Sequence, residues 1–373
     1  MNNEIKFTFD KLCFHEEDAW FIDINFGLLC KLDIESGKVG LIKKIPLTSG
    51  LIMQYRRMVS YKDLLVLIPY NSQYLLLYSV IEDRFESIRI ENAAMDNPGQ
   101  MMFSDAYVYK NNVFLIPARY PSIVKMNVDT RELCYFHDWG KEETYNKNRN
   151  LFSGNVLGKD NVLYVPYWQS YKVLKIDMDK SEFETIHPGP KGNGICAICH
   201  GKDSIILGAK DRLQIIKISL DGYKCEKVKD IVTSGINFAG AAYISKCEKD
   251  YLIYPLNGNQ IVKVNEEDDA VSVIHQWELE IIDDCKKYAF ANLVFLGFEE
   301  HNNIIYSYSQ YEGKLLAVNK VSGSVNSLVL TADNKSVEQA VEDQKKSMMS
   351  HKAVMEENQL IGLRDFICYV SGT

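Results

Sequence analysis

Several features that mark other protein classes are missing from this chain of 373 residues. It has no run of about 18 apolar residues, the length that a membrane-spanning helix needs. Residues 1–5 lack both the basic residues and the apolar segment of a secretory signal. The nine cysteines stand at irregular spacings unlike those of a disulfide framework, which favours a reducing compartment. We therefore expect a cytoplasmic protein without membrane insertion.

The chain also lacks an excess of positive charge. Its formal net charge is −8, and its lysines are scattered along the sequence. A field of that sign repels phosphate backbones, so we expect no nucleic acid among its partners. Hydrophobic residues make up 46% and charged residues 25% of the chain, a globular composition that argues against disorder.

Most of the chain repeats one pattern. An apolar strand ends near a proline, a short turn follows, and a second strand reads cation, apolar residue, then Asp or a small polar residue. Four of the nine prolines lie at this strand end, where no backbone donor is needed: Pro69, Pro117, Pro166 and Pro255. The apolar residues of the second strand recur about 48 residues apart: Leu32, Tyr78, Met126, Ile176, Ile218, Val264 and Val318.

Each copy contains four strand segments separated by three turns. A polar turn such as Lys62–Asp63 closes the first strand, and a turn such as Ser36–Gly37 follows the third. Four-stranded antiparallel units of about 40–50 residues, set side by side, are propeller blades. A helical solenoid of the same period does not fit, because the segments are short and rich in Val, Ile, Tyr and Phe.

We predict an all-β fold, a seven-bladed β-propeller of four-stranded antiparallel blades with a short C-terminal helical tail. Six or eight blades are the alternatives. The first and last units each contain four predicted strands of their own segment, so we expect no strand to be exchanged between them where the ring closes. The predicted blades are residues 8–45, 54–90, 102–137, 151–187, 195–229, 238–275 and 290–330.

The chain is expected to have two parts, a propeller over residues 1–331 and a helical tail over residues 332–373. Residues 336–358 contain neither Gly nor Pro and are rich in Glu, Gln, Lys, Met and Ala. Val337, Val341, Met348 and Met355 fall near one helical face. We expect this helix to pack on the propeller; the alternative is that it docks a partner.

The repeat resembles a known group of propellers. The segments Lys31-Leu32-Asp33-Ile34-Glu35-Ser36-Gly37-Lys38 and Leu163-Tyr164-Val165-Pro166 are similar to YVTN-type and PQQ-quinoprotein-type propeller repeats. The Trp-Asp dipeptides of WD40 blades are absent from the sequence. The resemblance covers most of the chain and implies the propeller fold, but its motif is structural and names no activity.

The most informative side chains lie in predicted turns. In a propeller, the turns between second and third strands share a face with the crossings between blades, and here they carry aromatic, amide and guanidinium groups. Such groups suit peptides, sugars or aromatic ligands. The alternative is that the tyrosines, of which the chain has 22, only cap the blades. The candidate ligand-binding residues are Phe26, Tyr70, Asn71, Arg119, Tyr120, Asn155, Tyr167, Trp168, Asn257 and Tyr311.

These residues favour a binding propeller that recognises a peptide, glycan or protein at the mouth of the channel. The alternative is an enzyme, because seven-bladed propellers include lactonases and some lyases. Arg56 and Arg57 would then hold an anionic substrate while Asp105 acts as a base. Alternatively, these residues have no catalytic role and form an ion pair that holds adjacent blades together.

No cofactor or metal site is expected. Cys196-Ala197-Ile198-Cys199-His200 matches a haem-attachment string, but on a strand its two thiols point to opposite faces, which favours buried cysteines. The segment 189–194 is glycine-rich without the ending of a phosphate loop, so we interpret it as a loop between blades. His137, His187 and His275 share one repeat position at the rim, too far apart to bind one metal.

Overall fold

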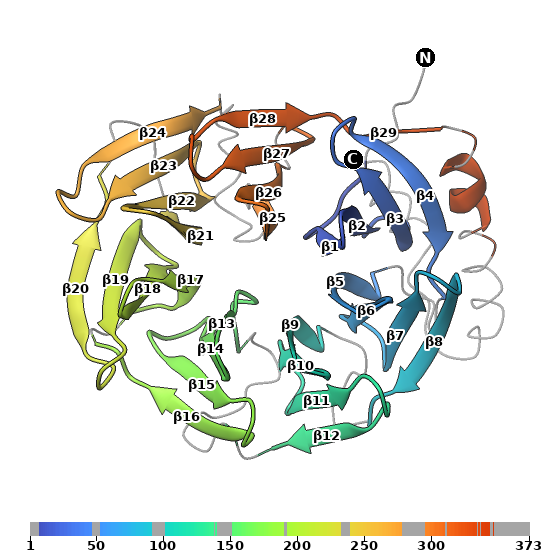
Figure 1. Ribbon diagram of the computed structural model, residues 1–373, viewed down its shortest axis with the longest axis horizontal. Helices are drawn as coiled ribbons and strands as arrows, with labels where there is room; N and C mark the ends of the chain where they lie inside the picture. Colours follow the sequence, from blue (N-terminus) through green and yellow to red (C-terminus); the bar gives the residue numbers. More distant parts are fainter. Residues whose placement is uncertain are drawn as a thin grey trace, which may run out of the picture. The chain divides into compact units, whose positions relative to one another are not determined.

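The structure is a computed structural model in which strands dominate. In the described part of the chain they form seven sheets of four consecutive antiparallel strands, and one of these sheets gains a fifth, parallel strand (Figure 1). The fold is the predicted seven-bladed β-propeller, and each sheet is one blade. No helix in the described part of the chain is long and apolar enough to cross a bilayer. The described residues are 7–46, 53–91, 101–137, 139, 151–189, 192–232, 239–277, 295–309, 312–333, 335, 337–343 and 346.

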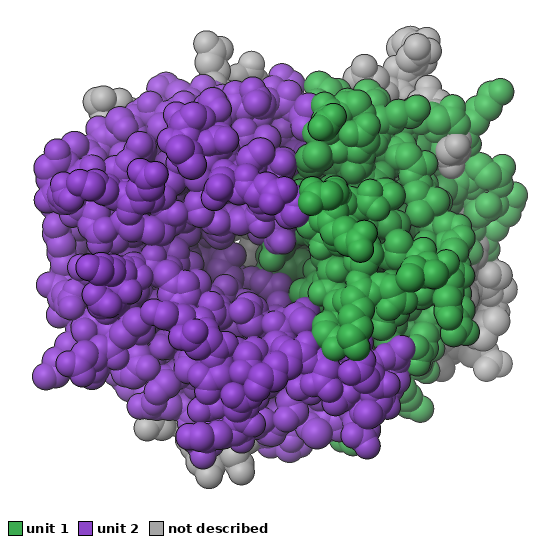
Figure 2. All heavy atoms as spheres, in the orientation of Figure 1, with its two compact units in different colours: residues 1–92, 96–100, 329–373 green, residues 93–95, 101–328 purple. Residues whose placement is uncertain are grey.

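The chain divides into two compact units, coloured separately in Figure 2. Unit 1 comprises residues 1–92, 96–100 and 329–373, and it contains blades 1 and 2. Blade 1 consists of β1 (Cys13–His15), β2 (Asp18–Asp23), β3 (Leu28–Asp33) and β4 (Lys38–Lys44), to which β29 (Thr331–Ala332) is added. Blade 2 consists of β5 (Tyr55–Tyr61), β6 (Leu64–Pro69), β7 (Tyr74–Ser79) and β8 (Arg84–Arg89).

Unit 2 comprises residues 93–95 and 101–328, and it contains blades 3 to 7. Blade 3 is β9 (Phe103–Tyr109), β10 (Asn112–Pro117), β11 (Ile123–Asn127) and β12 (Leu133–Phe136), and blade 4 is β13 (Leu157–Lys159), β14 (Val162–Pro166), β15 (Val173–Asp177) and β16 (Glu182–Ile186). Blade 5 is β17 (Ile195–His200), β18 (Ser204–Ala209), β19 (Gln214–Ser219) and β20 (Cys225–Asp230), and blade 6 is β21 (Ala239–Cys247), β22 (Asp250–Asn257), β23 (Gln260–Asn265) and β24 (Val271–Gln276). Blade 7 is β25 (Phe295–His301), β26 (Ile304–Ser309), β27 (Lys314–Asn319) and β28 (Val325–Leu328).

The repeated pattern maps onto the second and third strands of the blades. Pro69, Pro117 and Pro166 end second strands as predicted, whereas Pro255 lies inside β22, which continues to Asn257. All seven recurring apolar residues lie on third strands and are buried. Five of them belong to apolar clusters shared by two adjacent blades of the same unit: Tyr78, Ile176, Ile218, Val264 and Val318. These seven residues are Leu32, Tyr78, Met126, Ile176, Ile218, Val264 and Val318.

The apolar core is divided into layers between adjacent blades. In unit 1, Trp20 of blade 1 and Tyr78 of blade 2 lie in one buried cluster, with ring centroids 5.9 Å apart. In unit 2, separate clusters join blades 3 and 4, blades 4 and 5, blades 5 and 6, and blades 6 and 7. A single blade has no core of its own, so its burial depends on its neighbours.

Ion pairs at one repeat position also join neighbouring blades. Lys43 on β4 lies 2.6 Å from Asp83 in the β7–β8 turn of unit 1. Lys229 on β20 lies 3.2 Å from Asp269 in the β23–β24 turn of unit 2. Both aspartates have positive φ angles, 53° and 63°, in equivalent turns. The fourth strand of one blade thus contacts a turn of the next.

The C-terminal segment adds to blade 1. β29 pairs in parallel with β4, and the Thr331 N–H donates to the Gly37 carbonyl oxygen at 2.9 Å. Residues 337–343 are helical, and Val337 among them is fully buried. As expected, blades 1 and 7 each consist of four consecutive strands with none exchanged, and β29 is a fifth strand added to the free edge of β4. Most of the predicted helix beyond 343, including Met348 and Met355, lies outside the described residues.

Candidate functional site

The turns between second and third strands in blades 3 to 5 are hydrogen-bonded to the crossings between blades. The Leu151 N–H donates to the Ala118 carbonyl at 3.0 Å, and the Trp168 N–H donates to the Leu151 carbonyl at 2.8 Å. One blade further on, the Lys210 N–H donates to the Gly194 carbonyl at 3.0 Å. The expected sharing of a face by turns and crossings is therefore found within unit 2.

Two glycines allow the crossings to pass this close to the turns. Gly194 has a φ of +132°, and a Cβ there would lie 2.0 Å from the Trp168 carbonyl oxygen. Gly240 has a φ of +70°, and its Cβ would lie 2.2 Å from the Lys210 carbonyl oxygen. Backbone oxygens cannot yield by that much, so no other residue fits without moving the turns. The glycine-rich segment 189–194, where described, is thus the inter-blade loop that the sequence predicted.

Trp168 and Lys210 form the centre of the candidate site. The Lys210 Nζ lies 4.8 Å from the Trp168 ring centroid and donates a hydrogen bond of 2.9 Å to the Trp168 carbonyl oxygen. Both side chains are half-buried. Burial lowers the pKa of Lys210, although the nearby Cys196 and Asp211 oppose that change. The ammonium group is thus held over an aromatic face, where the ring quadrupole attracts it.

Further polar side chains lie beside this pair. The Asn193 Nδ2 donates to an Asp211 carboxylate oxygen at 2.7 Å, and the Arg212 Nε lies 3.4 Å from the other oxygen. Burial raises the pKa of Asp211, but the bonds from Arg212 and Asn193 outweigh it and leave that pKa lowered. In blade 3, Arg119 follows Ala118 in the turn that bonds to Leu151. We call Arg119, Trp168, Lys210 and Arg212 the turn surface.

Two of the predicted ligand-binding residues belong to the core instead. Tyr120 is 1% exposed and packs on Phe103 with ring centroids 5.0 Å apart. Tyr167 is 2% exposed and packs on Phe152 at 4.8 Å. Burial of a large ring is favourable, so these tyrosines face inward and their rings do not belong to a binding face. Their burial agrees with the alternative that these tyrosines cap the blades.

Asn155 also serves the packing of the blades. Its amide nitrogen donates to the Cys196 carbonyl oxygen of blade 5 and, at 3.1 Å, to the Ala242 carbonyl oxygen of blade 6. Both amide protons are thereby used, and the side chain joins three successive blades of unit 2. Asn257, in contrast, ends β22 as a half-buried residue beside the next turn. Tyr311 lies outside the described residues.

In unit 1 the candidate arginines bind a carboxylate. The Arg57 Nε lies 2.9 Å from an Asp10 oxygen, and the Arg56 guanidinium lies 3.4 Å from the same oxygen. The Arg56 guanidinium also lies over the Tyr70 ring, 4.8 Å from its centroid. Burial alone raises the pKa of Asp10, but attraction to Arg57 and Arg56 outweighs it, so the pKa is lowered. The two arginines of blade 2 therefore form an ion pair with the adjacent blade 1, and the carboxylate of that pair belongs to Asp10.

The other predicted residues are placed as follows. Phe26 and Asn71 lie half-buried in the second-to-third strand turns of blades 1 and 2. The Phe26 N–H donates to Asp23 at 2.8 Å. Asp105 lies on β9 of unit 2, is 4% exposed, and accepts a hydrogen bond of 2.9 Å from the Ala106 N–H. Because Asp105 and the two arginines belong to different units, their grouping stays a prediction.

The cysteines and histidines singled out in the sequence have separate contacts. Cys196 and Cys199 are buried free thiols, and burial raises the pKa of each. The His137 Nδ1 lies 2.6 Å from the Ser122 hydroxyl, whereas the His275 Nε2 lies 4.0 Å from Glu312. Within the described ranges, no three His, Cys, Asp or Glu side chains come close enough together to hold a metal ion.

Comparison with solved structures confirms the fold. The chain has the fold of a repeat propeller. BamB from Moraxella catarrhalis matches with a TM-score of 0.55 and 11% identity, over 80% of this chain and 82% of that chain. The RRP9 WD40 repeats match with a TM-score of 0.56 and 9% identity, over 82% and 88% of the two chains. U3-55K matches with a TM-score of 0.56 and 9% identity, over 82% and 89%.

These identities are too low to carry more than the fold. No family model matches the sequence, and no curated protein matches it. The function of this propeller must therefore be argued from its own side chains.

Sequence reasoning missed three residues of these clusters: Lys210, Arg212 and Asp10. Lys210 occupies the same repeat position before Ile218 as Trp168 does before Ile176, so the period alone identifies the pair as equivalent turn residues. It was overlooked because its turn contains no aromatic residue. Asp10 lies 47 positions from Arg57, and no local pattern connects them.

Proposed function

We propose that this protein is a cytoplasmic recognition propeller that binds a peptide segment of a partner protein at the turn surface. The observation that carries the proposal is the Trp168 ring, held half-buried at a turn under Lys210. A turn does not need an aromatic residue, and tryptophan and arginine are the side chains most enriched at binding hot spots.

The charges of the turn surface favour an acidic peptide. Arg119, Lys210 and Arg212 supply three cations on a chain whose net charge is −8. Asp211 contacts Arg212 and reduces the net positive charge of this group by one. A peptide with an aromatic or apolar anchor and flanking Asp or Glu would stack on Trp168 and pair with these cations. A neutral glycan could stack on the ring but would gain nothing from the positive charge.

The lactonase- or lyase-like alternative gains no support from unit 1. Its two arginines would have to hold an anionic substrate, but both are engaged by Asp10, whose side chain is 5% exposed. Displacing a buried partner carboxylate would cost more than a surface ion pair returns.

Selection of peptides against the whole protein tests the proposal. A displayed library of random peptides is selected on the immobilised chain, and the affinity of selected peptides is measured by fluorescence anisotropy. We expect enrichment of acidic sequences with an apolar anchor, and about tenfold or greater loss of affinity in Trp168→Ala and Arg119→Ala.

Lys202→Ala is the matched control. Lys202 is an exposed lysine in the β17–β18 turn, at the opposite end of blade 5 from Lys210. Affinity should be unchanged in this variant. If no peptide is enriched, or if the three variants affect affinity equally, the turn surface is not a peptide site.

A further inference from the structure

Two Asn-Gly dipeptides occur in the sequence, Asn193-Gly194 and Asn257-Gly258. An asparagine loses its side-chain amide most readily before glycine, because glycine has no side chain that keeps its backbone nitrogen away from the preceding amide. The structure places the two asparagines in different surroundings. Their reactivity therefore depends on the fold as well as on the dipeptide.

Asn193 is exposed in a bend outside any strand, and β17 begins two residues later at Ile195. The bonds that fix this crossing come after the peptide bond between Asn193 and Gly194. The Lys210 N–H donates to the Gly194 carbonyl at 3.0 Å, and the Ile195 N–H donates to the Tyr167 carbonyl at 3.1 Å. Among the described residues, the Gly194 N–H has no acceptor. The nitrogen that would attack the amide is thus not engaged in a ladder.

Asn257 is held more firmly than Asn193. It is half-buried, ends β22 and pairs with Ala239 in the ladder between β21 and β22. Closing a five-membered ring at Asn257 would distort a paired strand, whereas at Asn193 it changes only a bend. Asn257 is therefore an internal comparison for Asn193.

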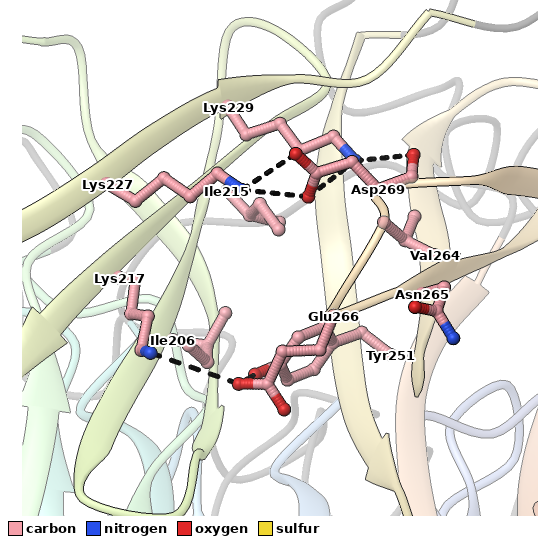
Figure 3. Close-up of a pocket in the computed structure, with 10 residues that line it drawn as sticks. All are labelled: Ile206, Ile215, Lys217, Lys227, Lys229, Tyr251, Val264, Asn265, Glu266 and Asp269. Carbon is pink, nitrogen blue, oxygen red and sulfur yellow. Dashed lines mark hydrogen bonds and ion pairs between the residues drawn. The ribbon is translucent and has the colours of Figure 1, made fainter. Parts of the chain in front are cut away.

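The Asn193 amide is also the nearest partner of a carboxylate beside the turn surface. Its Nδ2 donates to Asp211 at 2.7 Å, whereas the Arg212 Nε lies 3.4 Å from that carboxylate. In the cavity of about 180 Å³ between blades 5 and 6, by contrast, two lysines hold Asp269 (Figure 3). The closest partner of Asp211 is thus a neutral group. Conversion of that amide to a carboxylate would set two negative charges against each other.

We propose that Asn193 is a site of spontaneous deamidation, and that the resulting carboxylate weakens the binding of acidic peptides at the turn surface. The Gly194 nitrogen forms a bond to the side-chain carbonyl carbon of Asn193, and the bond from that carbon to Nδ2 breaks. Ammonia leaves with the proton of the Gly194 N–H, and a five-membered imide remains. Water then opens the imide at either carbonyl, which leaves an aspartate or an isoaspartate at position 193. Only water is consumed, and no group is oxidised or reduced.

Both products change the turn surface. Each replaces a neutral amide by a negative charge beside the cations of Arg119, Lys210 and Arg212, so the net positive charge falls by one. The isoaspartate also lengthens the backbone just before Gly194, which passes close to the Trp168 carbonyl oxygen. Acidic peptides should therefore bind the deamidated protein less tightly. This weakening rests on the proposed function, whereas the deamidation itself does not depend on it.

Incubation of the full-length protein tests the modification. The folded protein is kept in mildly alkaline buffer, and samples are digested and analysed by chromatography with mass spectrometry, which separates peptides containing asparagine, aspartate and isoaspartate. We expect Asn193 to convert at least about fivefold faster than Asn257, because only Asn257 is held in a ladder. In protein unfolded by urea, the two rates should agree within about twofold. Equal rates in the folded protein, or a faster rate at Asn257, would overturn the proposal.

Asn193→Asp tests the effect on binding. Its affinity for the selected acidic peptides, measured by fluorescence anisotropy, should be about tenfold lower than that of the wild type. Asn193→Ala is the matched control, because it also removes the bond to Asp211 but adds no charge. Its affinity should stay within about threefold of the wild type.

Equal affinities of Asn193→Asp and Asn193→Ala would show that charge at position 193 does not regulate the turn surface. If no acidic peptide binds the wild type, the proposed function and this regulation fail together. The mass spectra still decide in that case whether Asn193 is a modification site.

Discussion

Asp23 shows how one buried carboxyl can make stability depend on pH. Its side chain is fully buried, and the Thr8 and Phe26 N–H groups donate to its two oxygens at 2.9 and 2.8 Å. Burial raises its pKa from 3.8 to about 7, and the backbone donors only partly oppose this change. The folded protein therefore retains a proton at Asp23 over a pH range in which the unfolded chain has released it.

We predict that Asp23→Asn removes part of the pH dependence of unfolding. A raised carboxyl pKa contributes stability below pH 3.8, and this contribution is lost as pH rises to about 7. Over that interval the free energy of unfolding of the wild type should fall by up to about 4 kcal/mol more than that of Asp23→Asn. Urea denaturation at a series of pH values measures the difference. Glu35→Gln, in an exposed turn, should follow the wild type.

Gly194 allows a second residue-scale prediction. An added Cβ would lie 2.0 Å from the Trp168 carbonyl oxygen, and the φ of +132° is unfavourable for any other residue. Gly194→Ala should lower the free energy of unfolding by about 2–4 kcal/mol and shift the tryptophan emission. In Gly40→Ala nothing lies within 4 Å of the new atom, so stability should change by less than about 1 kcal/mol. Similar losses in both variants would contradict the close approach.

At the scale of elements, β29 protects the outer edge of blade 1. Its attachment includes the 2.9 Å bond from the Thr331 N–H to the Gly37 carbonyl. Thr331→Pro removes this donor and should lower the free energy of unfolding by about 1–3 kcal/mol, with faster amide exchange in β4. Thr331→Ala keeps the N–H and should behave like the wild type. Unchanged exchange in β4 after Thr331→Pro would show that β29 is dispensable there.

Across the whole molecule, burial is graded within each blade. The second strands β6, β10, β18 and β22 are mostly buried, whereas most residues of the fourth strands β8 and β20, and half of those of β24, are exposed. Amides of the second strands should exchange at least about tenfold more slowly than those of the fourth strands. Hydrogen exchange followed by mass spectrometry measures this. Equal protection of all four strands would mean that each blade opens as one unit.

The fold was predictable because its signals are local and repeated. Proline at the end of β6, β10 and β14 and a buried residue such as Met126 on every third strand recur at a nearly constant period. The turn residues Lys62 and Lys110 have positive φ angles, 52° and 54°, where the sequence predicted polar turns. Each of these features depends on a few neighbouring residues, so the amino-acid order alone is enough to reveal it.

Which side chains meet was a different matter. The repeat identifies Tyr120 and Trp168 alike as turn residues, yet one packs in the core and the other stays half-buried beside Lys210. The partner of Arg57 proved to be Asp10, and β29 joined a strand near the other end of the chain. These contacts join residues far apart in sequence, and they form only when separate blades are packed together. Such contacts cannot be deduced from composition or repeat period, so only the tertiary structure shows which residues form the candidate sites.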